Sequence, residues 1–389
     1  MSVPVIAAAK RTAIGRYGGM FKEVPPELLA AEVIRAILDE TRIEPGDIDD
    51  VILGNAVGPG GNIARLSALT AGLPVEVPGV TVDRQCGSGL EAIHLAARLI
   101  QAGAGDIYLA GGVESTSRAP WKIEKPLSLY GRGLPVFSGR ARFSPDFIGD
   151  PDMGKAANNV ADKYGITREQ QDLYAFHSQR KAADSIRSGR FRGEIVPISV
   201  MTGREMKVID TDECPRPDTT LQKLAALPPA FDAEGTVTAG NACPVNDGAA
   251  LVLIMSWKKA RSMGLQPVLK FADSAAAGVD PNYLGIGPVP AVNRLLARSR
   301  LTAEDIDIVE FNEAFASQVL ASLQQLSIPE EIVNIGGGAI ALGHPYGASG
   351  AILVTRLFSE MTRMHGGRGI TTLGIGGGMG LATLWERCE

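Results

Sequence analysis

The chain has 389 residues, of which 45% are hydrophobic and 21% are charged, and its formal net charge is −5. This composition is ordinary for a folded protein, and the length suits two or three packed units better than one simple core. The acidic balance argues against a nucleic-acid-binding protein, which needs a broad basic surface. It leaves room for a local basic cluster that holds one small anion.

The first predicted element is a buried strand from Pro4 to Ala9. Lys10 and Arg11 follow it at once, so we expect no signal peptide, and no apolar run is long enough to span a bilayer. The four cysteines are far apart and form no CxxC pair. We therefore expect a cytoplasmic protein without a membrane partner, a disulfide framework or a metal site. These cysteines are Cys86, Cys214, Cys243 and Cys388.

Two stretches of the sequence resemble each other and predict an internal duplication. Residues 46–55 and residues 304–312 each contain an acidic turn and a short apolar strand that ends at an asparagine. Each stretch follows an amphipathic helix, predicted over Leu28 to Thr41 and over Val289 to Ser299. A single match of this kind can arise by chance, but the likeness continues downstream.

Further along, the motif from Cys86 to Gly89 opens a predicted helix to about Gln101, and a strand follows at Ile107 to Ala110. In the second copy, Gly347 to Gly350 opens a helix to about Met364, followed by a strand at Gly369 to Leu373. Alternating helices and strands predict βαβ units and largely parallel sheets. Both helices are apolar nearly all round, so we expect them between two sheets rather than at the surface. Matches in the same order favour duplicated halves.

The middle of the chain differs in character, with prolines, arginines and loop residues before a long helix that begins with the capping box Thr167 to Gln170. We interpret this region as an insertion that covers one face of the core. The expected division is an N-terminal half at residues 1–118, an inserted loop domain at 119–240 and a C-terminal half at 241–389.

Cys86 is the strongest candidate for chemistry, because it lies between a predicted strand (Val80 to Asp83) and the start of a helix. The free N–H groups and partial positive charge of a helix N-terminus stabilise a thiolate. A small buried hydrophobic residue is the alternative interpretation, since free cysteines are commonly buried.

His344 lies in a glycine-rich loop just before the second of these helices, at the duplicated position of the cysteine loop. This position favours catalysis over a structural histidine. Asn312 ends a strand and can donate a hydrogen bond to a carbonyl oxygen or a water, although capping a turn is the simpler role. The glycines from Gly374 to Gly380 do not fit a dinucleotide-binding motif, because Met379 takes the last glycine position. Backbone N–H groups for an oxyanion are a better use of this turn.

Taken together, the motifs resemble those of the thiolase family, in the family's order and over nearly the whole chain. The resemblance implies a five-layered αβαβα fold, with two similar halves and an inserted loop domain. It also implies acyl-CoA and free coenzyme A as partners, and a homodimer or homotetramer, without nucleic acid or a metal or nicotinamide cofactor. The matching segments are residues 84–90, 111–115, 235–241, 246–250, 312–316, 343–345 and 374–380.

The resemblance implies the following roles for residues of this chain. Cys86 is the nucleophile that becomes acylated, His344 activates it and helps to bind the thioester oxygen, and Asn312 holds a water in the same oxyanion hole. The backbone N–H groups of Cys86 and Gly376 form a second hole. Contacts with substrate or coenzyme A are expected from Arg216, Cys243, Met153 and Phe315.

The sequence departs from the family pattern at Gly374, where family members usually carry a second cysteine that moves protons during C–C bond chemistry. Loss of a positioned acid–base group typically costs about 10²–10⁴-fold in rate. Cys243, in place of a usual serine, could supply a thiol; His344 could take both roles; or C–C chemistry could be lost. Three functions follow: an acetyl-CoA C-acyltransferase that acts through an acyl-Cys86 thioester, a Cys86-dependent acyltransferase or thioesterase, and a non-catalytic coenzyme A-binding protein.

Overall fold

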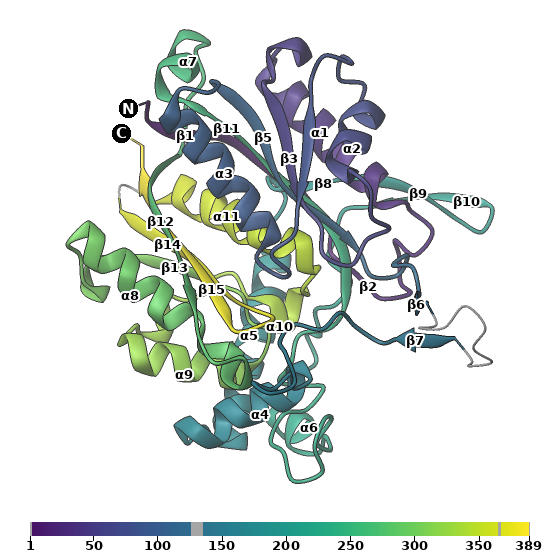
Figure 1. Ribbon diagram of the computed structural model, residues 1–389, viewed down its shortest axis with the longest axis vertical. Helices are drawn as coiled ribbons and strands as arrows, with labels where there is room; N and C mark the ends of the chain where they lie inside the picture. Colours follow the sequence, from purple (N-terminus) through teal and green to yellow (C-terminus); the bar gives the residue numbers. More distant parts are fainter. Residues whose placement is uncertain (1, 126–134, 365–366, 389) are drawn as a thin grey trace.

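The computed structural model describes residues 2–125, 135–364 and 367–388. In its N-terminal half, strands lie between two outer helices and one central helix, α3 (Figure 1). β3 pairs in parallel with β4 and β5, and β5 continues into the antiparallel strands β11 and β1. The elements are β1 (Pro4–Thr12), α1 (Pro26–Thr41), β3 (Asp50–Gly54), α2 (Ile63–Ala71), β4 (Gly79–Val82), α3 (Ser88–Ala102), β5 (Ile107–Ser115) and β11 (Asn246–Ser256).

The C-terminal half repeats this order of strands. β13 pairs in parallel with β14, and β14 continues into the antiparallel strands β15 and β12. The second central helix, α11, contacts α3 as well as strands of both halves. The elements are β12 (Leu269–Gly278), α8 (Pro288–Ser299), β13 (Ile308–Phe311), α9 (Ala316–Leu326), α10 (Ala339–Leu342), α11 (Tyr346–Arg363), β14 (Arg368–Ile375) and β15 (Met379–Arg387).

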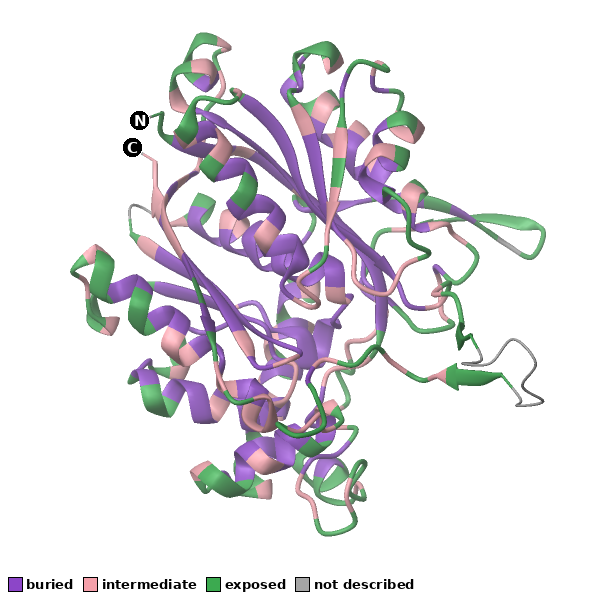
Figure 2. Ribbon diagram, in the orientation of Figure 1, coloured by how far each residue is buried: buried purple, intermediate pink, exposed green. Residues whose placement is uncertain are grey.

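The two sets of strands join edge to edge through a short antiparallel pairing of β1 and β12, in which Val5 faces Lys270 and Ile6 faces Leu269. The central helices lie between the two sets and are buried over most of their surface, whereas the outer helices are exposed on one side (Figure 2). Helix, sheet, central helices, sheet and helix therefore form the five layers that the resemblance to the thiolase family implies, and the expected fold class is confirmed.

The segment between the halves packs partly against the C-terminal half, where α4 contacts α9, and α5 contacts α9 and α10. β6 and β7 form a projecting hairpin, and β9 and β10 form another. β11, which follows the expected boundary at residue 240, is hydrogen-bonded between β1 and β5 of the N-terminal half. The principal elements are β6 (Lys122–Glu124), β7 (Val136–Ser138), α4 (Met153–Tyr164), α5 (Arg168–Arg187), β8 (Ile195–Val196), β9 (Ile198–Thr202), β10 (Glu205–Ile209) and α6 (Leu221–Ala225).

A buried ionic network ties this segment to both halves. Arg11 of β1 binds Asp212 through Nη1 at 2.7 Å and Glu194 through Nε at 2.8 Å. Glu194 also pairs with Arg356 of α11, and the side chains of Arg11, Glu194 and Arg356 are at most 2% exposed. Because removing one partner of a buried ion pair leaves an uncompensated charge, this network fixes the position of the segment.

Candidate active site

Cys86 lies on a tight turn between β4 and α3. Gln85 has a φ of +48°, in the left-handed region that non-glycine residues seldom adopt. The turn is closed by hydrogen bonds from the N–H of Gly87 to the carbonyl oxygen of Arg84 (2.9 Å) and from the N–H of Ser88 to that of Gln85 (3.0 Å). Strained backbone of this kind is concentrated at functional sites, where the surrounding structure holds it in place.

The thiol of Cys86 is protonated at neutral pH, although the side chain is partly accessible. Desolvation raises the pKa of Cys86 to about 12, against the lowering effect of hydrogen bonds from the N–H groups of Gly376 and of Cys86 itself. The helix N-terminus, which suggests a stabilised thiolate in the sequence, is therefore outweighed by desolvation. Cys86 needs a base to become a nucleophile.

His344 is held by the loop between α10 and α11. Gly343 has a φ of +117°, and a Cβ atom there would lie 2.6 Å from Cγ of Asn246, so the loop requires glycine. Oδ1 of Asn246 accepts the backbone N–H of His344 at 2.8 Å. On the imidazole, Nδ1 lies 2.6 Å from Oγ of Ser349.

The hydrogen bonds of Ser349 assign the tautomer of His344. The hydroxyl of Ser349 donates to the carbonyl oxygen of Pro345 at 3.1 Å, so its oxygen accepts the proton of Nδ1. Nε2 is then free to take up a proton. Burial lowers the pKa of His344 to about 4, which keeps the imidazole neutral and available as a base at neutral pH.

Asn312 follows the end of β13 and lies against this base. Its side-chain Nδ2 is 3.4 Å from Nε2 of His344, and the residue is 1% exposed. The backbone N–H of Asn312 donates to the carbonyl oxygen of Thr372 in β14 at 3.0 Å, which extends the pairing of the strands to this residue. The sheet therefore holds the amide of Asn312 against the imidazole, as the candidate roles require.

Gly376 begins the hairpin turn between β14 and β15, where Ile375 pairs with Met379. Gly377 and Gly378 have φ values of +86° and +78°. A turn of this shape allows a backbone N–H to face the thiol of Cys86, and the N–H of Gly376 does so. Gly376 and Cys86 thus present two N–H groups at one point, the arrangement of an oxyanion hole.

The loops of Cys86 and His344 meet where the two central helices cross. A Cβ atom at Gly89 would lie 2.6 Å from the carbonyl oxygen of Gly347, and one at Gly350 would lie 2.4 Å from the backbone nitrogen of Leu90. The carboxylate of Glu114 accepts the N–H of Gly347 at 3.0 Å. The helix starts therefore touch through backbone, which brings together loops about 260 positions apart in the sequence.

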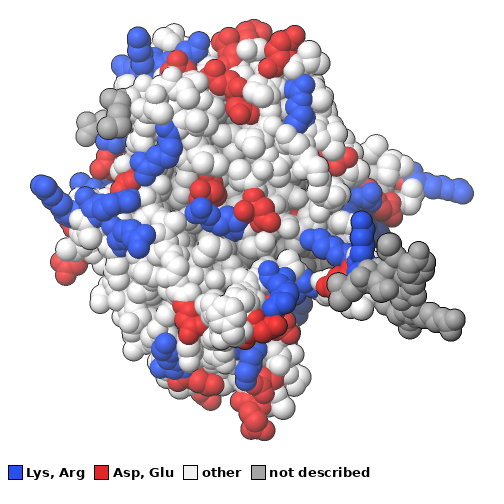
Figure 3. All heavy atoms as spheres, viewed as in Figure 1, with Lys and Arg blue, Asp and Glu red and all other residues white. Residues whose placement is uncertain are grey.

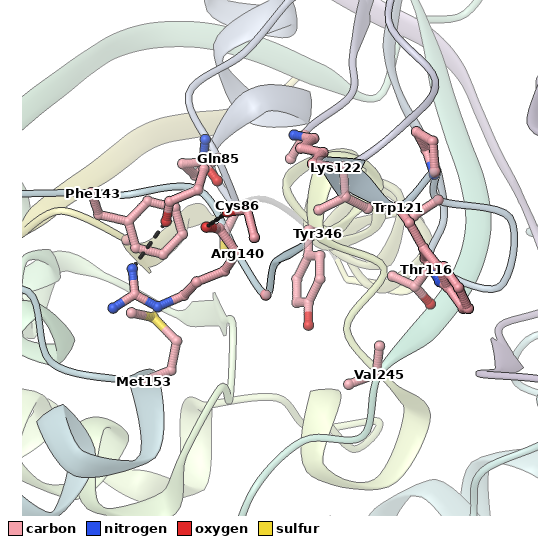
Figure 4. A pocket seen from close by; sticks show the side chains of 18 of the residues that line it. Gln85, Cys86, Thr116, Trp121, Lys122, Arg140, Phe143, Met153, Val245 and Tyr346 are labelled. Carbon is pink, nitrogen blue, oxygen red and sulfur yellow. Dashed lines mark hydrogen bonds between the residues drawn. The ribbon is translucent and has the colours of Figure 1, made fainter. Parts of the chain in front are cut away.

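A cavity of about 730 Å³ opens beside Cys86 and Gly376. In Figure 4, Tyr346 lies between Arg140, Phe143 and Met153 on one side and Thr116 and Trp121 on the other. The ring of Tyr346 also contacts His344 edge to face, with centroids 5.1 Å apart.

Aromatic and aliphatic side chains dominate the lining, which also includes Lys122 and Arg140, and Arg140 is paired with Asp150 and Asp152. On the face in Figure 3, lysine and arginine side chains gather beside the β6–β7 hairpin. An apolar cavity with a cationic rim suits a ligand that carries an acyl chain and an anionic group.

The expected coenzyme A contacts are only partly brought together. Met153 lines the cavity, whereas Arg216, Cys243 and Phe315 are absent from its lining. The backbone N–H of Cys243 donates to the carbonyl oxygen of Ala314 at 3.0 Å, and Phe315 packs against Phe231. Desolvation raises the pKa of the Cys243 thiol, which disfavours the thiolate that a relocated base needs.

Gly374 has little free space around it. A Cβ atom there would lie 2.7 Å from Nε2 of Gln318 and 3.2 Å from the carbonyl oxygen of Gly285. Gln318 is 1% exposed, and a larger residue at position 374 requires its side chain to move.

Sequence reasoning gave no role to Tyr346, Ser349 or Glu114, although each contacts the site. Ser349 lies five residues after His344 on the first turn of α11, and because His344 precedes this helix, no helical spacing rule relates the two. Glu114 gives no signal in the sequence, because its hydrogen-bond partners come from distant loops.

Among the described residues, no group of three or more His, Cys, Asp or Glu side chains is placed to hold a metal ion. In the same part of the chain, no helix is long and apolar enough to cross a membrane.

Comparison with known proteins defines a class of enzyme, an acyltransferase built from duplicated halves. Residues 4–258 match the family model for the thiolase N-terminal domain, and residues 265–387 match that for the thiolase C-terminal domain. The chain belongs to the thiolase family.

Relatives match along their whole length. "Putative acetyl-CoA C-acetyltransferase VraB" of Staphylococcus epidermidis is 52% identical over 387 residues, which cover 100% of this chain and 99% of the relative. The protein of the same name in Staphylococcus aureus is 48% identical and is covered completely, as is this chain. The crystal structure of the Bacillus anthracis acetyl-CoA acetyltransferase superposes with a TM-score of 0.93 at 40% identity, covering 100% of this chain and 99% of that one.

Proposed function

We propose that the protein is an acetyl-CoA C-acyltransferase that carries the acyl group as a thioester on Cys86, with acyl-CoA and free coenzyme A as its substrates. The observation that supports this most directly is the convergence of Cys86 with the N–H of Gly376, beside a cavity of suitable size. The names of the relatives point to the same reaction.

The acylation step follows from the tautomer of His344. Nε2 takes the proton of the Cys86 thiol as Sγ attacks the thioester carbonyl carbon, and the carbonyl oxygen gains negative charge between the N–H groups of Cys86 and Gly376. The C–S bond to coenzyme A then breaks. The departing sulfur takes the proton back from His344, which leaves acyl-Cys86, free coenzyme A and a neutral imidazole.

The C–C step places a second demand on His344. With glycine at position 374 and a raised pKa at Cys243, His344 is the group best suited to move the proton of the second substrate. In this role Nε2 of His344 takes the proton, and the neighbouring Nδ2 of Asn312 can donate a hydrogen bond to the thioester oxygen of that substrate. We also propose that the protein is a homo-oligomer in the cytoplasm and that it uses no metal or organic cofactor.

A thiolysis assay with acetoacetyl-CoA and coenzyme A tests the whole proposal, and intact-mass analysis tests the acyl-enzyme. The wild type is expected to turn over and to gain an acyl group, and Cys86→Ala is expected to do neither. A folded wild type that binds coenzyme A but never gains the adduct would sink the proposal and leave a binding protein.

A second candidate is an acyltransferase or thioesterase that makes no C–C bond, and Gly374 is the observation that favours it. An acyl adduct on Cys86 without thiolysis would support this candidate.

Gly374→Cys tests the missing base. The added side chain must displace Gln318, so we expect the single variant to gain little and the double variant with Gln318→Ala to gain up to about 10²-fold in thiolysis. Gln318→Ala alone is the control. Equal rates in all three folded variants would show that position 374 does not limit the reaction.

A further inference from the structure

A small cavity adjoins two of the side chains that surround His344. It has a volume of about 20 Å³, and its lining includes Asn312 and Ser349, whose polar side-chain atoms lie next to the ring nitrogens of His344. Its far wall includes Glu310 of β13 and Arg356 of α11, two elements that pack against each other. Glu310 and Asn312 are two positions apart at the end of β13 and therefore share a face.

Glu310 and Arg356 each carry a polar atom without a partner. Within the described part of the chain, Oε1 of Glu310 and Nε of Arg356 are buried and make no hydrogen bond. Each residue is 1% exposed. An unsatisfied buried polar group costs about 1–3 kcal/mol, so two of them beside one cavity require an explanation.

The two residues do not form an ion pair with each other. The ion pairs of Arg356 within 4.0 Å are with Glu194 and Glu360, and Glu310 is not among them. A gap of this kind between a donor and an acceptor is where a bridging water is found. One water needs a volume of about 10–15 Å³, and the cavity has room for one.

We propose that this cavity holds an ordered water that joins Arg356 to Glu310, and that Glu310 acts through it as a positioning residue for His344. The water accepts from the Nε–H of Arg356 and donates to Oε1 of Glu310. Its remaining hydrogen and lone pair face the wall formed by Ser349 and Asn312.

The position of the water explains how the imidazole of His344 is held. Ser349 accepts the Nδ1 proton of His344, and Asn312 lies against Nε2, so a fixed polar contact behind both sets the orientation of the imidazole. Burial raises the pKa of Glu310 to about 8, so the carboxyl is neutral at neutral pH and adds no charge to the neutral imidazole. The charged groups that face it are Arg356, Glu360, Glu194 and Glu313.

The water itself is tested by a crystal structure of the wild type at a resolution that shows solvent. Density for a water within about 3.2 Å of both Oε1 of Glu310 and Nε of Arg356 is expected. An empty cavity, or a direct contact between the two side chains, would overturn the proposal. This result does not depend on any variant or on any activity.

The role of Glu310 rests on the proposed function of His344 as the base of Cys86, and substitutions test it. Glu310→Leu keeps a similar volume but cannot hold the water, whereas Glu310→Gln can. Glu360→Gln is the matched control, because it changes the same ionic network on the other side of Arg356.

The first readout is the rate at which iodoacetamide alkylates Cys86, followed by intact mass at fixed pH, which requires no acyl-transfer activity. We expect Glu310→Leu to slow alkylation by about tenfold, which is a part of the rate effect of about 10²–10⁴-fold that a positioned base contributes. The rate for Glu310→Gln should stay within about threefold of the wild-type rate. In an active enzyme kcat should fall with little change in KM.

An unchanged rate in folded Glu310→Leu would overturn the proposal. So would equal slowing in Glu310→Gln or in Glu360→Gln, because the effect would then not follow the water. If the wild type never acylates Cys86, the proposed function fails, while the alkylation series and the crystal structure still decide on the water.

Discussion

The two halves of the molecule use one framework for two different tasks. The strand β3 leads to Asn55 in the first half, and β13 leads to Asn312 in the second. Asn55 donates to Oε1 of Glu114 at 2.8 Å, in a cluster that also binds the N–H of Gly347, whereas Asn312 faces His344. Asn55 thus holds the contact between the two halves, whereas the equivalent Asn312 faces His344.

The two loops before the central helices also differ in the residues that they carry. The loop before α3 carries Cys86, the proposed nucleophile, on a strained turn, and the loop before α11 carries His344, the proposed base, whose ring nitrogens lie near Ser349 and Asn312. Neither loop contains a complete site. Duplication supplied two helix starts at one junction, and the side chains on them then took different roles.

The largest expected effects come from removing the side chain of Cys86 and that of His344, one at a time. Cys86→Ala should lower thiolysis by about 10⁴-fold or more and abolish the adduct, because the covalent route is lost. His344→Ala should cost about 10²–10⁴-fold but still permit slow acylation, seen by intact mass. Equal and complete loss of the adduct in both variants would contradict separate roles for the loops.

A smaller effect is expected at the joint between the helices. Gly350→Ala places a methyl group 2.4 Å from the backbone nitrogen of Leu90, and this overpacking should cost about 1–3 kcal/mol in the free energy of unfolding. Gly46→Ala, where a Cβ atom meets nothing within 4 Å, is the control in the same denaturant titration. A stability for Gly350→Ala that equals the control would mean that the helices are not in tight contact.

Ser349→Ala sharpens the account of the base. Without the hydroxyl, Nδ1 loses its acceptor and the tautomer with a free Nε2 is less populated, so kcat should fall by about tenfold while KM changes little. Steady-state kinetics of the folded variant measure this. A fall in kcat/KM that comes wholly from KM would assign Ser349 to binding instead.

The last prediction is that the rate of acylation does not change with pH near neutrality. The lowered pKa of about 4 for His344 and the raised pKa of about 12 for Cys86 leave both groups neutral between pH 5 and pH 8. The rate of acylation should therefore be flat over this range, and fall only as His344 is protonated near pH 4. An inflection near pH 6.5, the value of an unperturbed imidazole, would show that His344 is exposed to water.

These pKa shifts also bear on stability. The folded pKa of His344 lies below the unfolded value of 6.5, so the unfolded state binds more protons as the pH falls below 6.5. The contribution of this residue to the free energy of unfolding is complete above pH 6.5 and is lost as the pH falls toward 4.

Much of the framework follows from the sequence. The predicted helices at Leu28 to Thr41 and Val289 to Ser299 correspond to α1 and α8 within two residues, because amphipathic spacing defines them locally. The loops of Cys86 and His344 were identified because unusual residue types stand among glycines. Their roles in the reaction stay predictions, as do those of Asn312 and Gly376.

Other features depend on contacts that no local pattern encodes. Desolvation of Cys86 outweighs the helix N-terminus from which a thiolate was expected, and burial of this kind depends on the whole fold rather than on the local sequence. Glu310 and Arg356 lie 46 positions apart in the sequence, so the cavity between them exists only after β13 and α11 have packed. The wall of the large cavity likewise combines β7, α4 and the start of α11.

The crossing of the central helices has a consequence for how such an enzyme can diversify. Gly89, Gly347 and Gly350 leave no space for a side chain, so small sequence changes cannot alter the spacing of Cys86 and His344. The hairpin that carries Trp121 and Phe137 and the ring of Tyr346 border the same cavity but lie outside this contact. Substitution of these aromatic residues can therefore adapt the cavity to other acyl chains, while the geometry of Cys86 and His344 stays constant.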